Sequence, residues 1–168
     1  SKLRIRYLGP QSGAKGFLLL KSALDELWKN QTNFCLDVHF VPTDMAPYIR
    51  VHDRYSYADL QGIFDETDVL VAPSIWYETF GFTVLEALSY GVPVVISGNV
   101  GATDILVDGA GIVVEDITSQ KLCLVLQNIT RKKLEKMNRI IVEQQPIMQI
   151  EEMAKQIEKL CYGWQLSE

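Results

Sequence analysis

One stretch near the middle of the chain constrains the fold most strongly. The apolar run Val69–Ala72 has the length of a buried strand, and Pro73 stops it. A polar and aromatic loop follows, and then the sequence at 84–89 favours a helix. We therefore predict a strand, a loop and a helix that starts near Phe80 or Gly81. The first backbone N–H groups of such a helix are unpaired, and its dipole favours an anion, so a phosphate fits at this point.

The same succession of apolar run, turn and helical pattern recurs along the chain. Further strands are predicted at 3–8, 34–41, 49–51, 94–96 and 111–114. Helices are predicted at 17–29, 60–64, 103–106, 119–126, 130–144 and after Pro146. Strands that alternate with helices predict an α/β fold, a doubly wound parallel sheet with right-handed crossovers. In such a sheet the loops at the carboxyl ends of the strands should converge on one ligand site.

Length, charge and cysteine content limit the class of protein. The 168 residues, 48% of them hydrophobic, suit a single domain with one core, and we expect it to be part of a longer chain. A formal charge of −5 argues against a nucleic-acid groove or a polybasic membrane surface. Cys35, Cys123 and Cys161 have no Cys-x-x-Cys spacing and are expected to be reduced core thiols, without a metal site. The absence of a signal-peptide pattern and of an apolar run of roughly 20 residues predicts a cytoplasmic domain.

Two glutamates and one lysine stand near the predicted site. Glu78 lies in the loop before the central helix, whereas Glu86 lies inside the helix among apolar neighbours, where an unpaired carboxylate is costly. Lys15 lies where the first helix begins, an end that disfavours a cation unless an anion is shared. Two interpretations stay open from the residues alone. Either the three groups bind a ligand, or Glu86 pairs with a backbone donor or with a cation such as Lys15 while Glu78 only favours the positive end of the helix.

Residues 73–86, together with Gly-Val-Pro-Val-Val at 91–95, resemble the donor-binding, C-terminal half of retaining glycosyltransferases with the two-domain GT-B fold. The likeness is to the glycogen-synthase-like and mannosyltransferase-like group, the group 1 family. Its features here are two glutamates with seven residues between them, Glu78 and Glu86, and an aromatic–glycine step between the two. Gly9 with Lys15 and Gly16 resembles the first phosphate loop of the family. The resemblance covers residues 3–116.

The resemblance implies a Rossmann-like domain that binds a UDP-, GDP- or ADP-sugar as donor substrate, with no further cofactor. It also implies retaining transfer to an acceptor glycan or lipid-linked sugar held by a missing N-terminal domain, which could also attach the protein to a membrane. Glu78 is the implied catalytic residue at the donor sugar, and Glu86 the implied ligand of the ribose hydroxyls. The implied contacts to the diphosphate come from Lys15 and from the backbone of Gly81, Phe82 and Thr83. The other implied donor-binding residues are Gly9, Thr79 and Phe80, and the candidates for base recognition are Arg54 and Tyr55.

Two positions depart from the family pattern. Pro10 stands where the family usually has an arginine on the diphosphate, and proline offers neither charge nor backbone N–H. Asp104 stands where a glutamate usually closes a glycine-rich loop, and its side chain is shorter. Three functions stay open: a glycosyltransferase that is inactive as an isolated domain, a non-catalytic nucleotide-sugar-binding module, or half of a sugar-nucleotide epimerase. In the isolated domain the loop aromatics, including Trp76 and Tyr77, are expected to be partly exposed.

Overall fold

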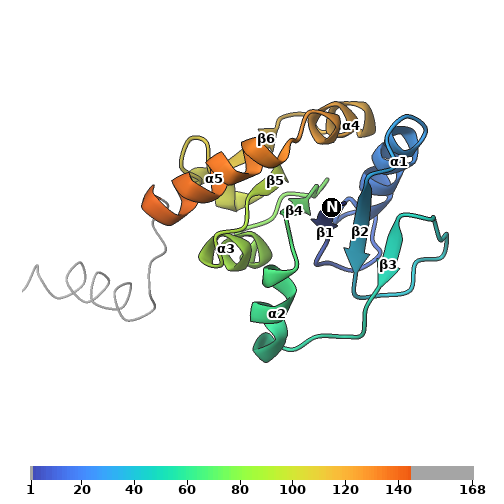
Figure 1. Ribbon diagram of the computed structural model, residues 1–168, viewed down its shortest axis with the longest axis horizontal. Helices are drawn as coiled ribbons and strands as arrows, with labels where there is room; N and C mark the ends of the chain where they lie inside the picture. The colour runs from blue at the N-terminus through green and yellow to red at the C-terminus, as the bar shows by residue number, and fades with distance from the viewer. Residues whose placement is uncertain (1, 145–168) are drawn as a thin grey trace, which may run out of the picture.

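A parallel sheet forms the centre of the computed structural model, which describes residues 2–144 (Figure 1). Its strands are β1 (Leu3–Arg6), β2 (Phe34–Val38), β3 (Ile49–Val51), β4 (Val69–Ala72), β5 (Val94–Ser97) and β6 (Gly111–Val114). They are ordered β3-β2-β1-β4-β5-β6, and each neighbouring pair is parallel. This order is that of a doubly wound, Rossmann-like sheet, so the predicted fold class is confirmed.

Helices cover both faces of the sheet. The α-helices are α1 (Phe17–Trp28), α2 (Leu60–Asp65), α3 (Phe82–Ser89), α4 (Ser119–Gln127) and α5 (Arg131–Gln144), and the 3₁₀-helices are η1 (Tyr57–Asp59) and η2 (Gly101–Ile105). Helices α1 and α4 lie on one side of the sheet, and α2 and α3 lie on the other (Figure 1). Helix α5 contributes Leu134 and Met137 to the first core and Ile141 to the second.

The strands are short and apolar because the sheet is buried on both sides. Every residue of β2 and β5 is buried, as parallel strands between two layers of helices require. Two predicted strands are too long, since β1 ends at Arg6 and β2 at Val38. The Tyr7 N–H still donates to the Asp37 carbonyl at 3.1 Å, and beyond this bond the two segments diverge into loops.

Several boundaries differ slightly from the predictions. Helix α3 begins at Phe82, within two residues of the predicted start, because Gly81 before it takes the left-handed conformation with φ of 91°. The short helix predicted at 103–106 is the 3₁₀-helix η2. The helix predicted after Pro146 lies outside the described residues, as does Cys161. Cys35 is a buried free thiol and Cys123 a partly buried one.

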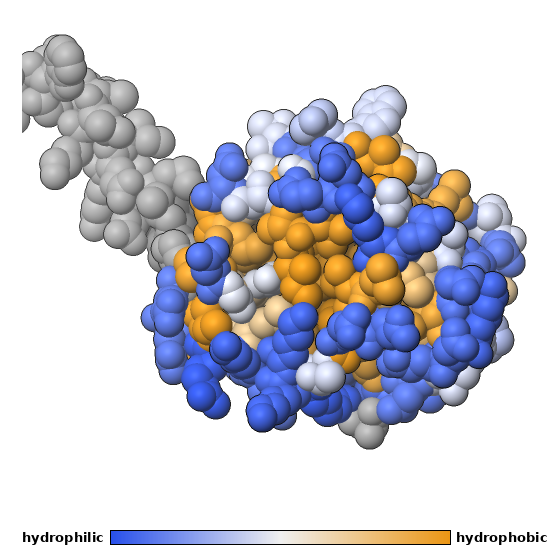
Figure 2. Space-filling view, turned by 90° about the horizontal axis from the view of Figure 1, so that it is seen from above, coloured by the Kyte–Doolittle hydropathy of each residue, from blue (hydrophilic) through white to orange (hydrophobic). Residues whose placement is uncertain are grey.

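One face of the molecule carries a central apolar area bordered by hydrophilic residues (Figure 2). Helices α1 and α4 each have an exposed leucine side chain, Leu18 and Leu124 respectively. Within residues 2–144, no helix combines the length and the apolar character that crossing a membrane would require.

Candidate functional site

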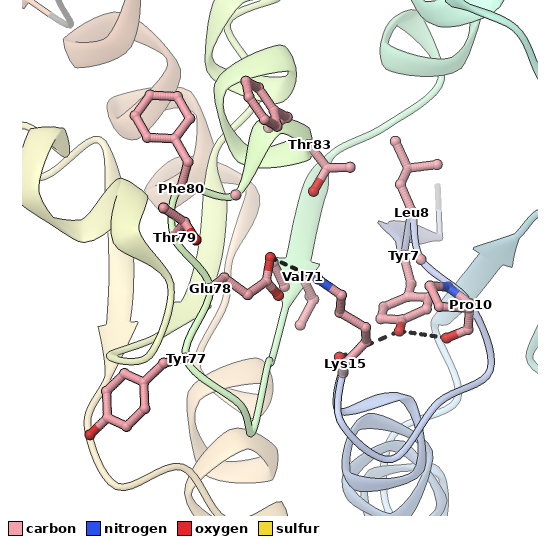
Figure 3. A pocket seen from close by; sticks show the side chains of 14 residues that line it. Tyr7, Leu8, Pro10, Lys15, Val71, Tyr77, Glu78, Thr79, Phe80 and Thr83 are labelled. Atoms are coloured by element: carbon pink, nitrogen blue, oxygen red, sulfur yellow. Dashed lines mark hydrogen bonds and ion pairs between the residues drawn. The ribbon is translucent and has the colours of Figure 1, made fainter.

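A cavity lies at the topological switch point of the sheet, between the adjacent strands β1 and β4. Strand β1 continues into α1 on one face, and the neighbouring β4 continues into α3 on the other, so the two connections leave the carboxyl ends of the strands toward opposite faces of the sheet. The cavity between them has a volume of about 510 Å³ (Figure 3). It is lined by Tyr7, Leu8, Gly9, Pro10, Lys15, Val71, Ala72, Tyr77, Glu78, Thr79, Phe80, Gly81, Phe82 and Thr83.

The loops that follow β1 and β4 are held against each other. The Ala14 carbonyl accepts hydrogen bonds from the N–H groups of Ile75 (2.9 Å) and Trp76 (3.2 Å) and from the Ser74 hydroxyl (3.2 Å). Gly16 takes a φ of 76°, and a Cβ added to it would lie 1.9 Å from the Pro73 carbonyl oxygen. Glycine is therefore required at this crossing, which fixes where Lys15 stands.

The loop after β5 joins the same site. The Glu78 N–H donates to the Asn99 carbonyl at 2.8 Å, and the Glu78 carbonyl accepts from the Gly101 N–H at 3.0 Å. A Cβ on Gly101 would lie 2.3 Å from the Thr79 carbonyl oxygen, so a side chain there would displace the loop. These bonds fix the backbone of Glu78 and confirm that the loops after β1, β4 and β5 converge.

An ion pair spans the cavity. Lys15 Nζ lies 3.0 Å from Glu78 Oε2, and the two side chains point toward one another from opposite loops (Figure 3). The Lys15 side chain is 45% exposed and that of Glu78 20% exposed, so both remain accessible to a ligand. Among the described lining residues these two are the only charged groups, and the charge of the lining is therefore balanced.

The beginning of α3 supplies further polar groups. No side chain of residues 2–144 caps this helix end, and its first turn carries no acidic residue. The Gly81 carbonyl accepts from the N–H groups of Val84 and Leu85, whereas those of Phe82 and Thr83 have no partner in the described part of the chain. The open N–H groups and the positive end of the helix dipole therefore face the space that Lys15 enters.

Glu86 lies beside the cavity rather than in its lining. Its side chain is half-buried in α3 without a hydrogen bond to any described residue, and burial raises the pKa of its carboxyl. The pairing of Glu86 with Lys15 that we had left open is wrong, because Lys15 pairs with Glu78. Burial and, second, the charge of Glu86 raise the pKa of Tyr55. Arg54 is exposed, and neither it nor Tyr55 lines the cavity.

Tyr7 is a lining residue that the sequence did not single out. It is 3% exposed, and its hydroxyl donates to the Pro10 carbonyl at 2.9 Å. Burial and, second, the nearby Glu78 raise its pKa, so the phenol stays protonated. A Cβ on Gly9 would lie 2.8 Å from the Tyr7 hydroxyl oxygen, which explains the glycine at that position. The only available signal was an aromatic residue two positions before the glycine-rich turn that begins at Gly9.

The remaining predicted positions lie at the rim or outside. Pro10 is exposed at the edge of the cavity, and Asp104 lies in η2 away from the lining. The Trp76 and Tyr77 side chains are 71% and 90% exposed, which confirms the expected exposure of the loop aromatics. Tyr77 points away from the ion pair (Figure 3). Residues 2–144 contain no group of three His, Cys, Asp or Glu side chains arranged to hold a metal ion.

Known proteins share this sequence pattern. A family model described as Glycosyl transferases group 1 matches residues 4–132. Sucrose synthase 2 of Oryza sativa subsp. japonica is 37% identical over 85 residues, which are 50% of this chain and 10% of that protein. Sucrose synthase 6 of Arabidopsis thaliana is 41% identical over 58 residues, 34% of this chain and 6% of that protein. The chain thus matches only a small part of these relatives.

Solved structures share the fold. HepE of Anabaena, in a complex with UDP-glucose, superposes with a TM-score of 0.72 at 17% identity, over 96% of this chain and 49% of HepE. The C-terminal domain of LpcC, a group 1 glycosyl transferase of Francisella tularensis, gives a TM-score of 0.70 at 18% identity, over 84% of this chain and 85% of that domain. The chain therefore belongs to the group 1 glycosyl transferases and has the Rossmann-like fold of one GT-B domain.

Proposed function

We propose that this chain is the donor-binding domain of a retaining glycosyltransferase that uses a nucleotide-diphosphate sugar. The observation that carries the proposal is the cavity at the switch point of the sheet. It combines Lys15, the open N-terminus of α3 and the Glu78 carboxylate within one space. A diphosphate between the lysine and the helix would leave the sugar next to Glu78. HepE, which has this fold, binds UDP-glucose in its crystal structure.

The proposed chemistry assigns different roles to the two sides of the cavity. Transfer breaks the bond between the anomeric carbon of the sugar and the diphosphate oxygen. Negative charge then grows on the diphosphate, where Lys15 and the N–H groups of Phe82 and Thr83 would stabilise it. Glu78, on the other side, would contact the sugar as an oxocarbenium-like positive charge develops. The other lining residues predicted for the donor are Gly9, Thr79, Phe80 and Gly81.

The nucleoside end of the donor is assigned to the neighbouring groups. The half-buried Glu86 carboxylate has acceptor capacity that no described residue uses, and two ribose hydroxyls could satisfy it. Tyr55 and Arg54 remain the candidates for base recognition, since the charge of Glu86 contributes to the raised pKa of Tyr55. This assignment divides the donor along the cavity, with the sugar at Glu78 and the ribose at Glu86.

We further propose that the acceptor of the sugar is a glycan or a lipid-linked sugar and that a second, N-terminal domain binds it. The chain matches 49% of HepE, and the exposed Tyr77 lines a cavity that a second domain could close. Closing the cavity would exclude water from the reacting carbon. The isolated chain is therefore expected to bind donor without transferring sugar. A cytoplasmic location remains our proposal, and the free thiols Cys35 and Cys123 suit a reducing compartment.

A second candidate function is a non-catalytic nucleotide-sugar-binding module. Pro10 favours it, because the cavity lining lacks the second cation and its net charge is zero. An epimerase half is the third candidate, and it would need acid–base residues from another domain.

Calorimetry with UDP, GDP and ADP and with their glucose or mannose conjugates tests the donor proposal. We expect one base to be preferred, with the sugar conjugate binding to the same site. Absence of binding for the whole panel would overturn the proposal. Incubating the full-length protein with the bound donor then separates the candidates. Sugar transfer or slow hydrolysis supports a transferase, binding without turnover indicates a module, and an epimerised sugar indicates an epimerase.

A further inference from the structure

A buried polar network lies at the carboxyl ends of β1, β2 and β3. Arg6 is 2% exposed and Asp37 1% exposed. Asp37 accepts hydrogen bonds from Arg50 Nη2 at 2.7 Å and from His52 Nε2 at 2.6 Å. Burial alone would raise the pKa of Asp37, but the bonds from Arg50 and His52 hold it below its ordinary value. Arg6 donates to Thr67 Oγ1 at 3.1 Å, so both buried charges are engaged.

His39 connects this network to the loop that follows β3. Its Nε2 lies 3.3 Å from Arg6 Nη1, and its Nδ1 lies 2.6 Å from the Asp53 carbonyl oxygen. A guanidinium can only donate, so Nε2 must accept, and Nδ1 must carry the hydrogen that is donated to Asp53. Both bonds are satisfied together only by the neutral imidazole with its proton on Nδ1.

The same ring packs against Tyr55, a candidate for base recognition. The ring centroids of His39 and Tyr55 are 4.7 Å apart in an edge-to-face arrangement, and those of His39 and His52 are 5.3 Å apart. The charge of Glu86 contributes, after burial, to the raised pKa of Tyr55. His39 therefore holds one side of residues 53–55, the loop that carries the two candidates for base recognition, Arg54 and Tyr55.

We infer that His39, as a neutral imidazole, is a positioning residue that holds residues 53–55, with the base-recognition candidates Arg54 and Tyr55, and releases them when it is protonated. The inference rests on the proposed function, because only that function places a nucleoside next to Tyr55 and Glu86. Protonation puts a hydrogen on Nε2 that points at Arg6 Nη1, so the hydrogen bond is replaced by a contact between two cations.

The charges around His39 decide the direction of the pH effect. Arg6 on β1 and His52 after β3 oppose a positive charge on the ring, while Asp37 on β2 favours it. Asp59 of η1 also interacts favourably with a charged His39. Asp37 is already paired with Arg50 and His52. Burial first, and then Arg6 and His52, hold the pKa of His39 below its ordinary value although the bond to Asp53 raises it.

The sign follows from this lowered pKa. At neutral pH His39 is uncharged in both the folded and the unfolded chain, and the loop is held. As the pH falls below about 6.5 the unfolded chain takes up the proton first, so this contribution to stability declines. It is lost as the pH passes the lower pKa of the folded protein, where the loop is released.

Two variants separate the hydrogen bond from the ring contact. His39→Asn retains an N–H group in the place of Nδ1 and does not titrate, whereas His39→Phe retains the ring against Tyr55 and makes no hydrogen bond. The probe is the preferred nucleotide sugar, whose two phosphates are both esterified and do not titrate near pH 6. We expect the wild-type affinity to fall about threefold to tenfold between roughly pH 8 and pH 5.5, the size of one lost hydrogen bond. His39→Asn should lose most of this pH dependence, and His39→Phe should bind more weakly at both pH values.

Two further measurements test the role of His39 separately. One shows whether a variant has lost its overall fold, and the other does not depend on the proposed donor. Inorganic pyrophosphate, which occupies only the diphosphate end, should bind the wild type and both variants equally at a given pH. The backbone NMR order parameters of residues 53–55, measured without ligand, should be lower in His39→Phe than in the wild type. The chain contains two histidines, so ring NMR signals can follow the titration of His39 directly, with His39→Asn providing the assignment.

The outcomes separate the two ideas. A wild type that binds no nucleotide sugar at any pH overturns the proposed function, and the order parameters still decide the role of His39. Unchanged order parameters at 53–55 in His39→Phe, or a donor affinity of the wild type that is independent of pH, overturns the inference.

Discussion

Replacing Lys15 with alanine should weaken the binding of a nucleoside diphosphate strongly while changing stability little. The lysine is 45% exposed and pairs with Glu78 at 3.0 Å, so the pair should contribute only about 0.2–1 kcal/mol to folding. In the complex Lys15 would make a charge-assisted hydrogen bond to the diphosphate. Such a bond contributes roughly 1.5–3 kcal/mol, and its loss corresponds to an affinity about tenfold to a hundredfold lower.

The partner of Lys15 adds to the expected loss. In Lys15→Ala the Glu78 carboxylate remains at the cavity without its cation, and it would repel the incoming diphosphate. The double variant Lys15→Ala/Glu78→Gln should therefore bind the nucleotide more tightly than Lys15→Ala alone. Glu78→Gln alone should keep the nucleotide affinity and lower sugar transfer in the full-length protein.

Calorimetry measures the affinities, and thermal unfolding measures the stability of the same samples. Lys29→Ala is the matched control, because Lys29 also forms an exposed ion pair, with Glu26, but lies away from the cavity. Unchanged nucleotide affinity in Lys15→Ala would remove the lysine from the site. An equal loss in Lys29→Ala would show that overall charge, not position, causes the effect.

Two other substitutions test the geometry around the cavity. Burial raises the pKa of Glu86, so the ionised carboxyl is unfavourable in the folded chain above that pKa. Glu86→Gln should therefore be at least as stable as the wild type at neutral pH in thermal unfolding, while its nucleoside diphosphate affinity falls; a clear loss of stability would contradict this. Gly16→Ala should cost more than about 1 kcal/mol, because its Cβ would collide with Pro73 at a φ of 76°. Gly13→Ala, where a Cβ meets nothing within 4 Å, should change the unfolding temperature little, and equal effects of the two would count against the argument.

The fold was predictable because the relevant signals are local. A run such as Val69–Ala72 is apolar throughout and is followed by proline, so both its burial and its end can be predicted from adjacent residues. The glycine at 16 and the glycine at 81 mark the places where the chain turns into α1 and α3. From such signals the alternation of strands and helices, and with it the position of the ligand site, follows from general rules of parallel sheets.

The contacts within the site were not predictable in the same way. The Lys15–Glu78 pair depends on β1 lying next to β4, with Ile5 opposite Val69, and no residue near either partner specifies this register. The tautomer of His39 likewise depends on its hydrogen bonds to Arg6 and Asp53. These three residues come from three separate segments of the chain. The candidate site residues could therefore be named from the sequence, but not their partners.

Pro10 allows a test of whether this site is weak because one cation is missing. The residue is exposed at the rim of the cavity, and its only described hydrogen bond uses the carbonyl, which accepts from Tyr7 at 2.9 Å. Pro10→Arg keeps that carbonyl, adds a guanidinium beside the balanced Lys15–Glu78 pair and gives the lining a net positive charge. Nucleoside diphosphate affinity should rise about tenfold, the lower end of the range for one charge-assisted bond. Pro47→Arg, which adds the same charge at an exposed proline outside the cavity, is the control. No gain in Pro10→Arg, or the same gain in both variants, would mean that proline at this position does not limit donor binding.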